Sequence, residues 1–264
     1  MKQRFILLAA FLAIAPLHAA DIKVDLSKEQ VGRPPVTFEP IVGTWTVVQD
    51  GPDKAIMVDG RPWVASKDTP TKLLVESARK LYGTNNEELM DNAKQFAYYP
   101  VAVLKGVDNF SNGAVSMKFK TVAGDADRCS GILFNVKPNG DWLALRYNDT
   151  EHNVILWEFH NGIRRPLIRP RDGELLKAEG DRAKWHELKL EVDGANIYGS
   201  LDGVRVLTYV LGSEPAPGRN NAPPSPDLFA ANNPVVRPPV TGKVGLWAKT
   251  DSTSYFKDYV VSPK

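Results

Sequence analysis

Cysteine is almost absent from this 264-residue sequence, in which Cys129 is the only one. A single cysteine cannot form an intrachain disulfide, so the fold must be stabilised by a hydrophobic core, for which the chain is long enough. Cys129 follows Arg128 and precedes an apolar stretch, and no histidine stands beside it in the sequence. This setting is typical of a small buried residue and does not favour a nucleophile.

A surplus of positive charge is also missing. The chain has 33 Lys and Arg residues against 31 Asp and Glu residues. Lys2 and Arg4 lie in the first few residues, so the rest of the chain carries equal numbers of basic and acidic side chains. Proteins that bind nucleic acid normally carry a strong basic excess or a basic stripe. The composition therefore predicts no nucleic-acid partner.

Long hydrophobic runs are absent except near the start. A short basic segment, residues 1–4, is followed by an apolar run over 5–17 and by small residues up to Ala20. This pattern predicts a cleavable signal peptide over residues 1–20, which is too short to span a bilayer by itself. We therefore expect an exported protein, periplasmic or secreted, without a membrane span.

The sequence is rich in short stretches of β-branched and aromatic residues, which turn signals separate at short intervals. Residues 114–121 alternate apolar and polar side chains, which indicates a strand with one buried face. Asp202-Gly203 is a strong hairpin signal. The pattern predicts an all-β fold, an antiparallel β-sandwich or jelly roll, as one domain over 41–264 after an extended leader over 21–40.

Two segments interrupt the strand pattern. Over residues 69–95, Thr69-Pro70 offers an N-cap followed by proline, and apolar residues then recur at helical spacing, which predicts a short helical insertion. Residues 212–241 are rich in proline and cannot form a helix or a central strand. A loop of that length is either flexible or a lid or contact segment, and the sequence leaves both open.

The stretch from Asp141 to Leu167 reads as a hairpin followed by a third strand. A four-residue loop over 149–152 would pair Asn148 with Asn153. Period-two alternation then predicts one face that carries a sugar-binding set: Trp142, Arg146, Asn148, Asn153 and Trp157. Indole rings suit the C–H face of a sugar, while the guanidinium and amides suit its hydroxyls. The alternative is that both tryptophans are core residues and that Arg146 pairs with a carboxylate.

Two further groups are candidates for chemistry. His160 shares a predicted strand with Glu158, and such a pair could act as a general base. An ordinary surface or hydrogen-bonded histidine is the alternative. Asp125 and Asp127 lie in a loop at a spacing that calcium can use, and the alternative is that they are carboxylates of a solvated turn. Neither H-x-H nor H-E-x-x-H occurs, so the sequence gives no support for zinc and names no firm cofactor.

A family resemblance is carried by four segments and one aromatic pair: Leu143–Asn148, Trp185–Val192, Leu201–Gly203, Gly242–Asp251 and Tyr255-Phe256. With them the sequence resembles the concanavalin A-like (laminin G-like) jelly-roll domains. In particular it is similar to the exported bacterial set related to the 3-keto-disaccharide hydrolase domain. The resemblance implies a jelly roll over residues 44–261 and, for some members, calcium at a sheet rim.

The function implied by this resemblance is broad, because one fold hosts many activities. We expect a protein that binds or processes a poly- or oligosaccharide on the face around Arg146 and Trp157. A keto-sugar hydrolase or lyase with a His160 or Glu158 base is the first alternative, and a non-catalytic adhesion or assembly module the second. Retaining glucanases of this fold carry an E-x-D-x-x-E strand, and this sequence has none.

Overall fold

The structure is a computed structural model that describes residues 19–62, 99–138, 140–160, 163–168, 184–212 and 239–264. The predicted helical insertion at 69–95 lies outside the described residues. So do most of the proline-rich loop and nearly all of the predicted signal peptide.

Within the described residues the chain forms fifteen β-strands and one short 3₁₀-helix, Leu26–Lys28. The first six strands are β1 Ile22–Lys23, β2 Phe38–Val42, β3 Thr44–Asp50, β4 Asp53–Asp59, β5 Val101–Leu104 and β6 Gly113–Ala123. The next four are β7 Cys129–Val136, β8 Trp142–Asn148, β9 Asn153–His160 and β10 Ile163–Ile168. The last five are β11 His186–Asp193, β12 Asn196–Leu201, β13 Val204–Val210, β14 Lys243–Trp247 and β15 Thr253–Pro263.

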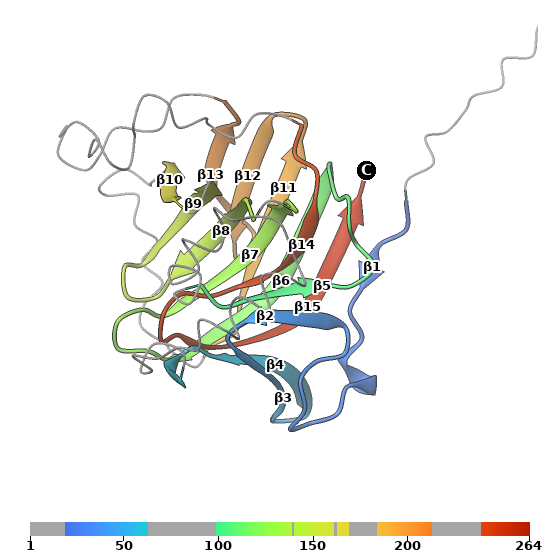
Figure 1. Cartoon of the computed structure of the whole chain (residues 1–264), viewed down its shortest axis with the longest axis vertical. Helices are drawn as coiled ribbons and strands as arrows, with labels where there is room; N and C mark the ends of the chain where they lie inside the picture. Colours follow the sequence, from blue (N-terminus) through green and yellow to red (C-terminus); the bar gives the residue numbers. More distant parts are fainter. Residues whose placement is uncertain (1–18, 63–98, 139, 161–162, 169–183, 213–238) are drawn as a thin grey trace, which may run out of the picture.

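The strands form two antiparallel sheets that pack face to face (Figure 1). Sheet A has the order β13-β12-β11-β6-β15-β4-β3, and β1 pairs with β15 as its eighth strand. Sheet B has the order β10-β9-β8-β7-β14-β5-β2. The predicted antiparallel β-sandwich is therefore confirmed. The predicted turn at Asp202-Gly203 joins β12 to β13 with positive φ at both residues, as a tight hairpin requires.

The main hydrophobic core lies between the sheets. On β6 the alternating residues Val115, Met117 and Phe119 are all at most 1% exposed and face the core. Sheet B contributes Leu143 and Leu145, among others, from its inward face. The opposite, outward face of sheet B is also apolar over much of its area: Leu133, Trp142, Ala144, Phe159 and Trp247 form a second buried cluster there.

The segment before β3 is part of the sandwich. Ile22 and Lys23 pair with β15, and the N–H of Val24 donates to the carbonyl of Tyr259 at 2.9 Å. β2 contains Pro40, which has no N–H to donate. An edge strand tolerates proline, and β2 is at the edge of sheet B, where it pairs with β5 alone.

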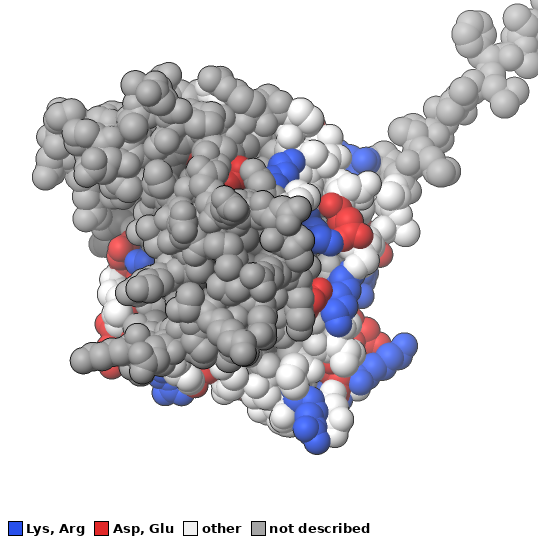
Figure 2. All heavy atoms as spheres, viewed as in Figure 1, with Lys and Arg blue, Asp and Glu red and all other residues white. Residues whose placement is uncertain are grey.

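Charges of both signs are interspersed on the surface. On the described part of the face in Figure 2, Lys and Arg lie beside Asp and Glu. Lys257 and Asp53 (2.6 Å) and Lys118 and Asp258 (2.9 Å) are two ion pairs of the structure. Among the described residues, no helix has both the length and the apolar character needed to cross a membrane.

Candidate functional site

The β8–β9 hairpin has the pairing that a four-residue loop predicts. Asn148 pairs with Asn153 and Ala144 pairs with Trp157. The loop begins with an Asn-type turn, because the N–H of Thr150 donates to Asn148 Oδ1 at 2.8 Å. The loop ends at His152 with a φ of 50°. This register places the five predicted ligand-binding residues together on the outward face of sheet B.

Although they share a face, these five side chains are buried in the structure. Their exposed fractions run from 0% for Asn148 to 6% for Trp157. Trp142 is separated from the others by its packing. Its ring stacks on Phe159 with centroids 5.0 Å apart and meets Trp247 edge-on at 6.2 Å. It therefore belongs to the apolar half of the face, whereas the other four belong to a polar half.

Arg146 is the centre of the polar half. Its Nη2 donates to Asn153 Oδ1 at 2.7 Å and to Glu151 Oε2 at 2.9 Å. Its guanidinium carbon lies 5.7 Å from the centre of the Trp157 ring. Arg146 therefore does pair with a carboxylate, as the alternative interpretation of the sequence anticipated. We call Arg146, Glu151, Asn153 and Trp157 the Arg146 cluster.

The Arg146 cluster has unused hydrogen-bonding capacity. The guanidinium has five N–H donors, and within the described part of the chain the buried Nε has no hydrogen-bond partner. Glu151 contributes the accessible part of the cluster, because 48% of its side chain is exposed, against 1% for Arg146. The cluster is thus fixed internally by hydrogen bonds and meets solvent on the side of Glu151.

A second polar group adjoins the first. Asp127, 6% exposed, accepts hydrogen bonds from Asn148 Nδ2 at 3.2 Å and from Thr250 Oγ1 at 3.0 Å, and Lys249 Nζ lies 2.8 Å from its Oδ2. We call Asp127, Asn148, Lys249 and Thr250 the Asp127 cluster. The charge of the Asp127 carboxylate is thus compensated by the Lys249 ammonium.

Cys129 joins the two clusters. Its Sγ lies 3.8 Å from Arg146 Nη1 and 3.7 Å from Asp127 Oδ1, so the thiol can accept from the arginine and donate to the aspartate. Burial raises the pKa of the Cys129 thiol to about 12. The thiol therefore stays protonated at neutral pH, which agrees with a structural donor and excludes an activated nucleophile.

The charges of the Arg146 cluster are balanced. Burial raises the pKa of Glu151, but the charge and hydrogen bond of Arg146, together with the Asn153 amide, outweigh burial and lower it below its ordinary value. Glu151 is therefore ionised at neutral pH and holds Arg146 in place. The cluster offers directed donors and acceptors beside an indole ring without a large net charge.

The other predicted metal residue, Asp125, lies in the loop between β6 and β7. Its main-chain N–H donates to Asp251 Oδ2 at 2.6 Å, and the same carboxylate accepts from Ala126 at 3.0 Å and from Asp127 at 3.0 Å. Asp251 thus fastens this loop to the loop between β14 and β15. Among the described residues no three His, Cys, Asp or Glu side chains are grouped as a metal site would need.

This loop connection predicts a pH-dependent loss of stability. Partial burial raises the pKa of Asp251, but the three main-chain N–H groups outweigh it and lower the pKa below its ordinary value. A carboxyl group whose pKa is lower in the folded than in the unfolded state stabilises the fold above about pH 4. This stabilisation is lost as the pH falls through the pKa of the folded state. Asp251→Asn should therefore lower the free energy of unfolding by about 1–2 kcal/mol at pH 7, and by less at low pH.

Urea unfolding at pH 7 and at low pH tests this expectation. The matched control is Asp258→Asn, because Asp258 is an exposed carboxylate whose partner is the half-exposed Lys118. If the free energies of unfolding of Asp251→Asn and the parent differed by the same amount at both pH values, the assigned role of the Asp251 carboxylate would be contradicted.

The two candidate catalytic residues lie elsewhere. Glu158 pairs with Leu143, so it is on the inward face of sheet B, and it is fully buried. His160 is the last residue of β9 and pairs with Ile163, while its side chain lies outside what the structure describes. The sheet thus separates Glu158 from the Arg146 cluster.

Comparison with known proteins defines the class of fold. The sequence matches no protein-family model and no curated protein. The fold is similar to that of the carbohydrate-binding module CBM66 from Bacillus subtilis, with a TM-score of 0.51 and 13% identity over 86% of this chain and 96% of the module. At that identity the similarity establishes the jelly-roll fold alone. It is consistent with the concanavalin A-like fold that the sequence resemblance implied.

More distant similarities are to enzyme-associated domains. Domain 4 of AbnA, a GH43 extracellular arabinanase from Geobacillus stearothermophilus, in complex with arabinotriose, gives a TM-score of 0.44 and 13% identity, over 90% of this chain and 85% of that domain. Bacillus licheniformis β-glucanase gives 0.37 and 11%, over 63% of this chain and 71% of the glucanase. These TM-scores are too low to add to the comparison of folds.

Proposed function

We propose that this protein binds carbohydrate on the outward face of sheet B, with the Arg146 cluster as its site. The observation that carries the proposal is the fixed position of Arg146 over Trp157, held by Asn153 at 2.7 Å and by Glu151 at 2.9 Å. A side chain that is already immobilised loses little entropy when a ligand binds. The jelly-roll fold is compatible with this function but does not prove it, since one fold hosts many functions.

The chemistry of the Arg146 cluster suits a neutral oligosaccharide. Sugar hydroxyls can accept from the guanidinium N–H groups that Asn153, Glu151 and Cys129 leave free, and they can donate to the exposed carboxylate of Glu151. The Trp157 ring supports the guanidinium from behind, and because only 6% of Trp157 is exposed a sugar could meet no more than its edge. Since Glu151 is the exposed member of the cluster, we expect the sugar to approach from its side.

Replacing Arg146 with Ala should weaken glycan binding at least about tenfold, because the hydrogen bonds of a charged group contribute about 1.5–3 kcal/mol each. A glycan array first identifies a ligand, and isothermal titration calorimetry then compares the variant with the parent. Arg146→Lys, which keeps the charge but loses the forked geometry, should also bind more weakly.

Arg205→Ala is the matched control. Arg205 also lies over an aromatic ring, with its guanidinium carbon 4.2 Å from the centre of Tyr198, and also pairs with a glutamate, Glu191, at 3.4 Å. It is on sheet A, so its loss should leave the affinity unchanged. If Arg146→Ala binds as tightly as the parent, the site is misplaced. If no glycan binds the parent protein, the proposed function itself fails.

Turnover of a 3-keto-sugar, with His160 or Glu158 as base, is the alternative that rests on the sequence resemblance. Glu158 is buried on the inward face, so a sugar held at the Arg146 cluster would not touch it. We therefore favour binding over catalysis. Assays of 3-keto-glucosides, with and without added calcium or zinc, distinguish the two, because turnover would require a second site.

The proposal includes export to the periplasm or the medium, for which the pattern of residues 1–20 is the support. Mass spectrometry of the protein recovered from the cell envelope and the medium tests it, since cleavage would remove these residues.

A further inference from the structure

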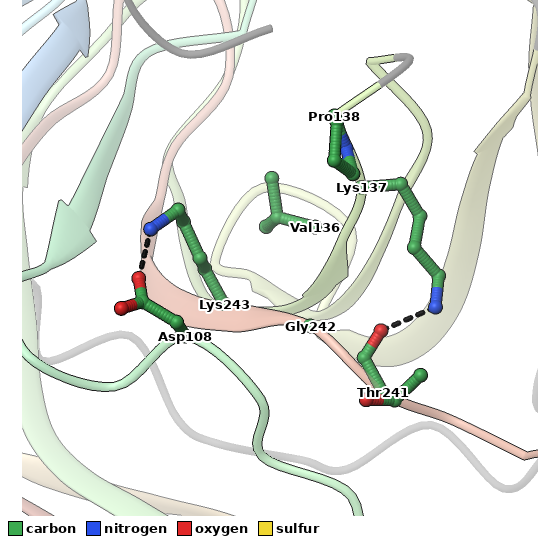
Figure 3. Close-up of a pocket in the computed structure, with 7 residues that line it drawn as sticks. All are labelled: Asp108, Val136, Lys137, Pro138, Thr241, Gly242 and Lys243. Carbon is green, nitrogen blue, oxygen red and sulfur yellow. Dashed lines mark hydrogen bonds and ion pairs between the residues drawn. The ribbon is translucent and has the colours of Figure 1, made fainter.

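A cleft of about 360 Å³ opens at the end of sheet B that lies away from the Arg146 cluster (Figure 3). It lies where β7 ends and β14 begins, with one residue from the loop after β5. The described residues that line it are Asp108, Val136, Lys137, Pro138, Thr241, Gly242 and Lys243. Cys129, beside the Arg146 cluster, and Val136, at the cleft, are the two ends of β7, about 23 Å apart at the usual rise per residue. The cleft is therefore separate from the proposed glycan site.

The floor of the cleft is built from main chain that approaches closely. Gly242 lies so near to β7 that a Cβ on it would be 2.5 Å from the Val136 carbonyl oxygen. The lack of space requires glycine at this position. Among the lining residues labelled in Figure 3, exposed Pro138 supplies the apolar surface of the cleft, and Val136, which is 3% exposed, contributes little of it.

Two lysines flank this apolar surface, and they differ in how their charges are compensated. Lys243 forms an ion pair with Asp108, whose side chain is 69% exposed. The ammonium of Lys137 instead donates to the main-chain carbonyl of Thr241, and within the described residues it has no ion-pair partner. Figure 3 shows the two ammonium groups on opposite sides of Val136.

The environment of Lys137 favours an anion. Partial burial lowers the pKa of Lys137, and the charge of Asp141 acts in the opposite sense. A half-buried ammonium that lacks a counter-ion gains more from a carboxylate than a fully solvated one does. An ammonium also has three N–H donors, and the Thr241 carbonyl takes one of them.

We propose that this cleft binds a sugar acid, with the carboxylate at Lys137 and the C–H face of the ring on exposed Pro138. The volume is at the lower end of the range for small-molecule sites, which suits a single sugar ring. Lys243 adds a second positive charge across the cleft. Its partner Asp108 is exposed and neutralises this charge only in part, so Lys243 also favours an anionic ligand.

Calorimetric titration with sodium D-glucuronate, and with D-glucose as its neutral counterpart, tests the proposal. Glucuronate should bind with a dissociation constant of about millimolar size, as expected for a small ligand with one charged contact, and glucose at least about tenfold more weakly. Lys137→Gln should weaken glucuronate binding about tenfold and Lys243→Gln about threefold. Lys137→Arg should retain it, because the charge remains.

Lys118→Gln is the control, because Lys118 is a half-exposed lysine on the other sheet, paired with Asp258. It should bind glucuronate as the parent does. Thermal melts of each variant establish that it is folded, and Lys243→Gln tests the cleft independently if Lys137→Gln unfolds. Equal binding of glucose and glucuronate, or unchanged binding by folded variants at both lysines, would overturn the proposal. Inorganic phosphate that binds as tightly as glucuronate would overturn the role of the sugar ring.

Discussion

Replacing Asp127 with Ala should lower the free energy of unfolding by about 3 kcal/mol, because it leaves a largely buried lysine without its counter-ion. Lys249 is 20% exposed and lies 2.8 Å from the Asp127 carboxylate. The change also removes the acceptor for Asn148 Nδ2, which belongs to a fully buried side chain, and unpaired buried donors are costly. Urea unfolding at pH 7 measures the loss.

Two further variants separate the buried charge from other effects. Asp127→Ala combined with Lys249→Met should recover part of the lost stability, because the unpaired charge is then absent. Asp53→Ala is the matched control: Asp53 also pairs with a lysine, Lys257, at 2.6 Å, but 55% of its side chain is exposed. Its loss should destabilise the protein much less, because solvent screens an exposed ion pair. An equal effect of Asp127→Ala and Asp53→Ala would contradict the assigned role of the buried pair.

The strands and the hairpin register could be predicted because their signals are local. Alternation along β6 identifies its buried face within a few residues, and Asp202-Gly203 identifies its own turn. In the β8–β9 hairpin, Asn148 Oδ1 accepts the N–H of Thr150 and so fixes the loop from within. The grouping of Arg146 with Asn153 and Trp157 follows from that register, since a shift of one residue would reverse every side chain.

The Asp127 cluster could not be predicted in the same way. Asp127 and Thr250 are 123 residues apart in sequence, and they meet only because the β6–β7 and β14–β15 loops lie at the same end of the sandwich. No pattern of residue spacing in the sequence indicates that these two loops are close in space. The sequence therefore did not indicate Lys249, which is the positive charge that the structure places beside Asp127.

The degree of burial of a side chain also cannot be predicted from the alternation of apolar and polar residues along a strand. Period-two spacing tells which side chains share a face of a sheet, but it does not tell how much solvent reaches that face. Arg146 and Trp142 were grouped correctly by face, yet one is held by polar partners and the other by aromatic rings. The composition of the neighbouring strands decides this difference, since Trp247 of β14 comes from a distant part of the sequence.

Replacing Trp142 with Ala should lower the free energy of unfolding by about 3–5 kcal/mol, because it removes a large, 1% exposed side chain from a packed aromatic cluster. The ring of Trp142 is stacked against Phe159 with an interplanar angle of 8°, and Tyr99 meets it edge-on at 5.8 Å. We therefore expect Trp142 to act through packing rather than through contact with a sugar.

Trp142→Phe distinguishes packing from ligand contact. The smaller ring keeps most of the aromatic contacts, so this variant should regain most of the stability that Trp142→Ala loses and should bind glycan like the parent. Urea unfolding and calorimetric titration are measured on the same preparations, so that a loss of binding can be compared with the fraction folded. Normal stability with lost binding in Trp142→Phe would instead make Trp142 a ligand contact, and the site would then extend from the polar half of the outward face into its apolar half.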